Sequence, residues 1–249
     1  MLDSSLFAEG PARDERFVVK DRWIECTNLP PEHPLRPTEF FHRQMNEEIN
    51  GLECSARCLA DFPDADWEIR MWLSRQCADE ARHAIMFRRI LEERGGFVGQ
   101  FPVLNFQYRI INRIDTLVGR LAIQNRSFEA GGIDAIAFAV RETRVRGDFA
   151  LADLHEAQLA DEIVHVRFAN DWIHSRIQHD RKVLLQIGMA MAGAEKAFFE
   201  VMGAEGTEGV RFAAAQQARF EAGFSYDEVK LADELVTRRF SAADSSQNS

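Results

Sequence analysis

Apolar residues recur at steps of three and four through most of the chain, which is the periodicity of amphipathic α-helices. Proline and glycine interrupt the pattern at a few places, so the helices have predictable ends. The pattern predicts an all-α protein with four long helices, covering Thr38 to Asp61, Ala65 to Arg94, Gln107 to Arg146 and Asp148 to His179. The first two are joined by a short turn, which makes them antiparallel neighbours.

Individual residues predict details of these helices. Thr38 and Asp148 are suitable N-cap residues for the first and fourth helix. The pair Gly131-Gly132 predicts a kink or bulge within the third helix.

The segments outside the four helices differ in composition. Residues 1–36 contain several prolines towards the end of the segment, which predicts an irregular N-terminal arm. Residues 37–180 form the expected four-helix bundle, and residues 181–240 predict additional helices packed on it. One of these is apolar and begins near Val183, and another covers Val210 to Phe240. Residues 241–249 are polar and predict a disordered tail.

One polar motif occurs twice on apolar stripes. Glu80 and His83 lie on the second helix and Glu162 and His165 on the fourth, 82 residues apart at both positions (162 − 80 and 165 − 83). A spacing of three residues points both side chains of each pair to the same helix face. Ionisable groups on core-facing stripes are costly to bury unless they are paired or bind a metal. The repeat therefore predicts a buried, carboxylate-bridged pair of metal ions.

Such a pair requires further carboxylates from the remaining two helices. The third helix offers Glu129, and the first offers Glu47, Glu48 and Glu53. The 82-residue offset from Glu129 points to Glu47, but Glu47 is turned about 100° from the apolar stripe. We select Glu48 and keep Glu47 and Glu53 as alternatives, because a helix cannot rotate one residue alone. The stripe consists of Met45, Glu48, Leu52, Ala56 and Leu59.

Asp79 and Asp161 directly precede the glutamates of the two motifs. A carboxylate beside a ligating histidine often accepts a hydrogen bond from the other ring nitrogen and so fixes its tautomer. We expect this supporting role for both aspartates.

Charge and composition restrict the location and partners of the protein. The formal net charge of −10 disfavours nucleic acid and anionic membranes as general partners. The N-terminal residues do not read as a signal peptide, and no apolar run reaches the roughly 18 residues of a transmembrane helix. We therefore expect a cytoplasmic protein without a membrane contact, and we consider a homodimer as its assembly. The four cysteines are expected to be free thiols.

These motifs resemble the ferritin-like di-iron carboxylate superfamily. More closely, they are similar to a ferritin-like domain family whose members mostly lack an assigned function. The resemblance covers residues 38–180 and implies a ferritin-like bundle. The matching ligands are Glu48, Glu80, His83, Glu129, Glu162 and His165.

The resemblance implies that two Fe ions, with Mn as the main competitor, activate dioxygen to oxidise a small organic substrate. An external electron donor would reduce the metals, and no catalytic residue separate from the ligands is required. Phe87 stands where radical-storing relatives carry a tyrosine, and no C-x-x-C iron domain is present. The alternatives are a ferroxidase or iron-handling protein, a tRNA-modifying hydroxylase, and a binding module with a vestigial site.

Overall fold

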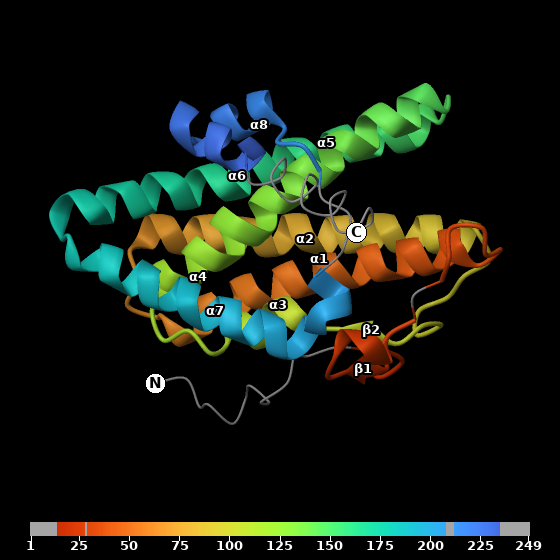
Figure 1. Cartoon of the computed structure of the whole chain (residues 1–249), viewed down its shortest axis with the longest axis horizontal. Helices are drawn as coiled ribbons and strands as arrows, with labels where there is room; N and C mark the ends of the chain where they lie inside the picture. Colours follow the sequence, from red (N-terminus) through yellow and green to blue (C-terminus); the bar gives the residue numbers. More distant parts are fainter. Residues whose placement is uncertain (1–13, 28, 208–211, 235–249) are drawn as a thin grey trace, which may run out of the picture. The chain divides into compact units, whose positions relative to one another are not determined.

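The computed structural model describes residues 14–27, 29–207 and 212–234 and confirms an all-α protein (Figure 1). In this part of the chain the only strands are β1 (Val19–Lys20) and β2 (Val103–Leu104), which pair in parallel. The described residues fall into two compact units. Unit 1 combines residues up to Gln124 with those from Leu184 to Thr207, and unit 2 combines Asn125–Val183 with residues 212–234. The expected division into 1–36, 37–180, 181–240 and 241–249 remains a prediction.

Two long helices, α1 (Arg36–Asp61) and α2 (Trp67–Glu93), form the frame of unit 1 and run side by side (Figure 1). Their bounds agree closely with the prediction, but Thr38 is not the N-cap. The helix begins two residues earlier, with Pro37 in its first turn, where the missing N–H of proline costs no hydrogen bond. The Thr38 hydroxyl instead donates to the Leu35 carbonyl at 2.8 Å.

The predicted third helix is interrupted, so its expected course from Gln107 to Arg146 is wrong. The structure has α3 (Phe106–Ile111), α4 (Leu117–Ile123), the π-helix η3 (Gln124–Glu129) and α5 (Ala130–Val145). Thr116 caps α4 by accepting a hydrogen bond from the Gly119 N–H, and this restarts the helix after a turn. The irregularity lies in η3, immediately before the Gly131-Gly132 pair that predicted a kink.

The predicted fourth helix is present in unit 2 as α6 (Phe149–His179). Asp148 caps it as expected, because its carboxylate accepts a hydrogen bond from the Leu151 N–H at 3.2 Å. α6 packs against α5 within this unit. The apolar helix expected near Val183 is α7 (Lys182–Thr207), which contains a positive φ of 65° at Gly203.

The single helix expected from Val210 to Phe240 is wrong in its described part. Residues 212–215 are not helical, α8 (Gln216–Glu221) is short, and a second helical stretch covers 226–234. Gly223 has a φ of +87°, which ends the helical path between these two pieces. Residues 208–211 and 235–240, together with the expected disordered tail 241–249, lie outside the described residues.

A partly buried ion pair attaches α8 to α5. Arg219 donates to both carboxylate oxygens of Asp134, at 2.9 and 2.6 Å, and the Ala215 N–H donates to the same group at 2.8 Å. Bidentate contacts of this type are among the stronger hydrogen bonds in proteins. They position the segment after residue 212 on α5.

Side chains of α1 hold the segment that contains β2. His42 is fully buried and its Nε2 accepts a hydrogen bond from the Gly99 N–H at 2.9 Å. Four residues further on, the Asn46 amide donates to the Leu104 carbonyl at 2.9 Å. The rings of Phe17 and Phe101 pack on His42 with centroid distances of 5.7 Å each. These contacts explain how β1 and β2 pair beside α1.

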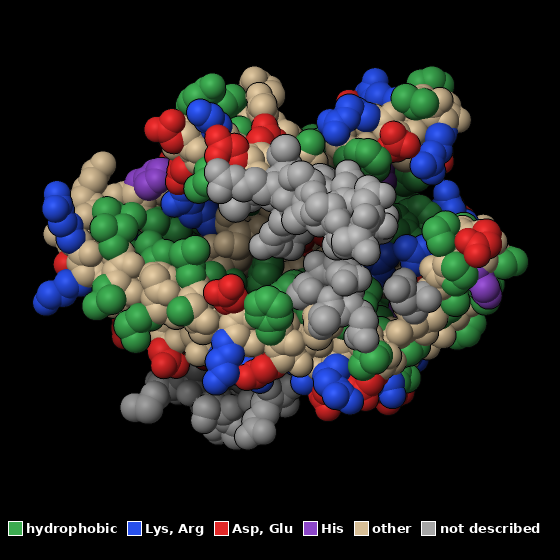
Figure 2. Space-filling view, in the orientation of Figure 1, with side chains coloured by type: hydrophobic (Ala, Val, Ile, Leu, Met, Phe, Trp, Pro, Cys, Tyr) green, Lys and Arg blue, Asp and Glu red, His purple; other side chains and the backbone are tan. Residues whose placement is uncertain are grey.

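None of the described helices is apolar over a length sufficient to cross a membrane. On the face shown in Figure 2, Lys and Arg side chains are interspersed with Asp and Glu. All four cysteines are free, as the sequence predicts.

His42 predicts a specific pH dependence of stability. Burial lowers the pKa of His42 from 6.5 to about 4. Between these values the unfolded chain binds a proton that the folded chain does not bind, so stability falls as pH decreases from 6.5 to 4. The loss attributable to this residue is roughly 3 kcal/mol.

The variant His42→Gln isolates this effect, because a glutamine oxygen can still accept from Gly99. Urea unfolding at several pH values between 4 and 7 should show a flatter profile for the variant than for the wild type. Parallel profiles would show that His42 does not titrate in this range.

Candidate metal centre

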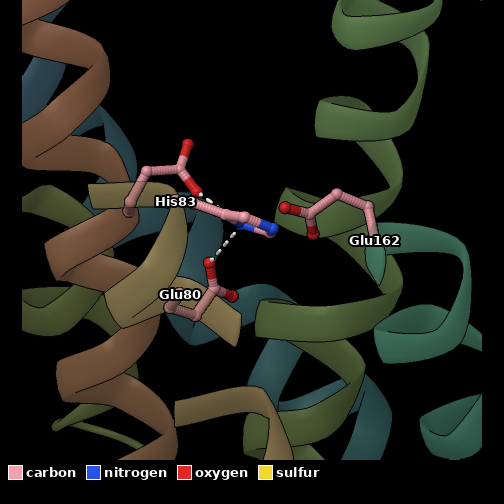
Figure 3. Close-up of side chains that lie close together, drawn as sticks. Glu80, His83 and Glu162 are labelled. Atoms are coloured by element: carbon pink, nitrogen blue, oxygen red, sulfur yellow. Dashed lines mark hydrogen bonds and ion pairs between the residues drawn. The ribbon is translucent and has the colours of Figure 1, made fainter. Parts of the chain in front are cut away.

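Unit 1 contains a buried cluster of two carboxylates and one imidazole. Glu48 extends from α1, and Glu80 and His83 extend from α2. The Nδ1 atom of His83 lies 3.2 Å from Glu48 Oε2 and 3.5 Å from Glu80 Oε2 (dashed lines in Figure 3). Each residue exposes 7% of its surface or less. The structure thus brings together the three ligands that the sequence predicts on the first two helices.

The helix pattern explains why these polar groups are buried. Leu73 and Phe87 lie on the same stripe of α2 as the Glu80 and His83 pair, and both are 1% exposed. Because these apolar side chains pack in the interior of the unit, the helix face that carries them points inward. Glu80 and His83 lie on the same face and are therefore buried with them.

The three candidate glutamates of the first helix have different surroundings in the structure. Glu48 lies beside His83, as described above. Glu47 is half-buried and accepts a hydrogen bond from the Gln107 amide at 3.3 Å. Glu53 is buried, but among the described residues it does not belong to the clusters that offer ligand atoms to one metal. Among these three glutamates, Glu48 belongs to the cluster in the described structure, and its role as a metal ligand remains a prediction.

Sequence reasoning missed two features around the Glu80 carboxylate. Gln76 is fully buried, and its amide donates to Glu80 Oε1 at 3.1 Å. On the α1 side, a Cβ atom added to Gly51 would lie 2.9 Å from Cδ and Oε1 of Glu80. The first feature had a signal in the sequence, because Gln158 precedes Glu162 as Gln76 precedes Glu80, again 82 residues apart (158 − 76).

Unit 2 contains a second cluster with the same donor types. Glu129 is the last residue of η3, and Glu162 and His165 lie on α6. The Nδ1 atom of His165 is 3.3 Å from Glu162 Oε2, and the three residues offer ligand atoms within 4.8 Å of one another. All three are buried, with exposed fractions of 9% or less. Glu162 is the third residue labelled in Figure 3.

Two buried polar residues accompany this second cluster. The Asn125 amide of η3 donates to the backbone carbonyl of His165 at 3.1 Å, which connects the π-helix to the ligand-bearing turn of α6. His155 is buried one turn before Gln158, and its Nδ1 lies 3.5 Å from the Gln158 amide oxygen. Burial lowers the pKa of His155, which favours the neutral imidazole.

The expected supporting aspartates differ in their surroundings. Asp79 is buried and pairs with two arginines of its own helix, Arg75 at 3.3 Å and Arg82 at 3.1 Å. Asp161 is half-buried. Their predicted hydrogen bonds to ligand histidines remain a prediction.

Each cluster is suited to hold a cation. Two ligand atoms bonded to one metal at 2.0–2.2 Å are separated by roughly 3 to 3.5 Å. The Nδ1 to Oε2 separations of 3.2, 3.5 and 3.3 Å fall in this range. Two buried carboxylates beside one imidazole also leave a local negative charge that a divalent ion would compensate. Buried Glu and His clusters that can bind a metal ion are thus present in both units.

Comparisons with known proteins identify a family but no function. Searches of the curated proteins and of the solved structures found no significant match. A family model described as "Protein of unknown function (DUF455)" matches residues 7–230, which is most of the chain. The chain belongs to this family.

Proposed function

We propose that the protein is a non-heme di-iron oxidoreductase that uses dioxygen to oxidise a small organic substrate. In this proposal the six ligands that the sequence resemblance implies, three in each unit, hold two metal ions. The proposed fold is the ferritin-like four-helix bundle over residues 37–180 that the sequence resemblance implies. The observation that carries the proposal is the presence of two buried clusters with identical donor sets.

The charges of the clusters support two divalent ions. Four carboxylates carry a formal charge of −4, and the imidazoles bind metal in their neutral form. Two divalent cations balance this charge. Three protein ligands do not saturate an ion such as Fe²⁺ or Mn²⁺, so carboxylates shared between two ions would help to complete both coordination shells. Positions left over are available to dioxygen or water.

The donor set also limits the identity of the metal. Mixed carboxylate and imidazole ligands suit Fe, with Mn as the main competitor, whereas thiolates would favour softer metals. When bound, a pair of redox-active ions would supply electrons to dioxygen, and an external donor would restore them. The residues of this chain would position the ligands, with a carboxylate oxygen beside Nδ1 of His83 and beside Nδ1 of His165. Burial of the clusters would exclude bulk water.

The first test is metal content. Reconstitution with Fe²⁺ under anaerobic conditions should give close to two ions per chain by elemental analysis. Glu48→Ala should lose at least one ion, because it removes the α1 carboxylate 3.2 Å from His83. Glu47→Ala should retain both, because Glu47 contacts Gln107 instead.

Glu47→Ala is the matched control for Glu48→Ala, because both variants lose a glutamate side chain and the two positions are adjacent. Circular dichroism of the metal-free variants should confirm that both are folded. One tightly held ion per chain, or loss of metal from the Glu47 variant alone, would contradict the proposed centre.

Gly51 provides a test that leaves every ligand in place. Gly51→Ala should reduce metal occupancy, because its Cβ would force the Glu80 carboxylate to move from a contact of 2.9 Å. The carboxylate is the end of a flexible side chain, so the metal-free variant should still fold. Gly188→Ala is the control, since Gly188 is also helical and no atom lies within 4 Å of its added Cβ. Equal metal content in both variants would contradict the predicted role of Glu80.

The reaction with dioxygen tests the enzymatic part of the proposal. The reduced, metal-loaded protein should consume dioxygen without leaving a stable tyrosyl radical. Phe87 is buried one turn after His83, where a radical-storing relative has a tyrosine. Tyr108 is also buried, and burial raises the pKa of its phenol, but it lies on α3 and not on a ligand-bearing helix.

Dioxygen uptake and electron paramagnetic resonance should be recorded with and without candidate organic substrates. Uptake that increases with one substrate supports an oxygenase or oxidase. Sustained Fe²⁺ oxidation that no organic molecule affects would favour iron handling. A tyrosyl signal in high yield that Tyr108→Phe abolishes would place the protein among radical-generating enzymes.

A further inference from the structure

The two oxygens of the Glu80 carboxylate have different neighbours. Oε1 accepts a hydrogen bond from the Gln76 amide at 3.1 Å, and Oε2 lies 3.5 Å from Nδ1 of His83. Glu48 Oε2 also approaches this nitrogen, at 3.2 Å. The hydrogen bond from Gln76 and the approach of His83 therefore involve different oxygens of Glu80.

Gln76 is an unusual residue for a packing position. It lies on α2 one turn before Glu80 and none of its surface is exposed. A buried amide costs free energy unless its polar atoms are hydrogen-bonded, and an apolar side chain of similar size would fill the space without that cost. Its hydrogen bond to a cluster carboxylate is a specific reason for an amide at this position.

The backbone of α1 also limits the space around this carboxylate. Gly51 approaches Glu80 so closely that a Cβ atom would lie 2.9 Å from Cδ and Oε1. The Gly51 backbone and the Gln76 amide thus both lie beside the Glu80 carboxylate, and the added Cβ would be closer to Oε1 than to Oε2, which would lie 3.4 Å away. Together these contacts restrict rotation of the group.

The same residue type recurs in the second half of the chain. Gln158 precedes Glu162 by four residues and is 3% exposed. Ala78 and Ala160 also correspond, so both halves contain Gln-x-Ala-Asp-Glu-x-x-His with an offset of 82 residues (158 − 76 and 160 − 78). A second buried glutamine at the corresponding position indicates that the amide belongs to the site and not to general packing.

We propose that Gln76 is a positioning residue for the metal centre. Its amide occupies Oε1 of Glu80 and presents Oε2, together with Glu48 and His83, to the metal ion of unit 1. This inference rests on the proposed metal centre. Hydrogen bonds from neighbouring residues to ligating carboxylates and imidazoles typically change metal affinity by roughly 10- to 100-fold.

The test is a Co²⁺ titration of the full-length protein followed by visible absorption, which reports both affinity and coordination geometry. Gln76→Met keeps the length of the side chain but removes the donor. It should weaken binding of one of two Co²⁺ ions by roughly tenfold or more and change the absorption spectrum. Thermal unfolding of the metal-free variant should remain close to that of the wild type.

Gln217→Leu is the matched control. Gln217 donates to Glu221 at 2.9 Å with the same spacing of four residues, but it is exposed on α8. Its loss should change neither affinity nor spectrum. Gln76→Leu serves as the second variant if Gln76→Met does not fold.

The outcomes separate the two proposals. If the wild type binds two Co²⁺ ions and both Gln76 variants bind them with the same affinity and spectrum, the positioning role is wrong and the metal centre stands. If the wild type binds no Co²⁺ at these residues, the metal centre and the positioning role are both wrong.

Discussion

The structure depends on the burial of carboxylates inside helix pairs. Glu48 and Glu80 in unit 1, and Glu129 and Glu162 in unit 2, are at least 91% buried beside an imidazole. Without a cation, negative groups at this separation repel one another and lose their hydration, so the clusters work against folding. Bound divalent ions would reverse the sign of this contribution. Metal binding and folding are then linked, since ligands gathered only in the folded chain stabilise it when the metal binds.

The unbroken helices could be predicted well because their periodicity is continuous. α1 contains no break between Met45 and Leu59, so a rotation of 100° per residue separates Glu47 from Glu48 reliably. The offset between the halves points instead to Glu47, which is not part of the cluster among the described residues. Glu48 to Glu80 covers 32 residues (80 − 48) and Glu129 to Glu162 covers 33 (162 − 129), so one fixed offset does not relate both pairs.

The incorrect helix predictions share a physical cause, which is that local polar contacts override a continuous apolar pattern. The Thr116 hydroxyl caps α4 and restarts the helix within a continuous apolar periodicity of the sequence. In the C-terminal region, Gly223 adopts a positive φ, and Asp134 binds the Ala215 N–H and the Arg219 guanidinium. The hydrogen bonds of Asp134 come from residues more than 80 positions away, so periodicity alone contains no signal for them.

The orientation of the Glu80 carboxylate in the unit 1 cluster depends on two neighbouring residues that are not themselves predicted ligands. Gly51 has no side chain, which allows α1 to approach Glu80, and Gln76 fixes one oxygen of the same carboxylate. Neither residue is a metal ligand, and neither would be selected by a search for ligand types. Rigid helices bring these groups to within a few ångströms, and short-range contacts then decide which oxygen is presented. A ligand motif in the sequence therefore predicts where a metal can bind, whereas the neighbours of each carboxylate determine how it binds.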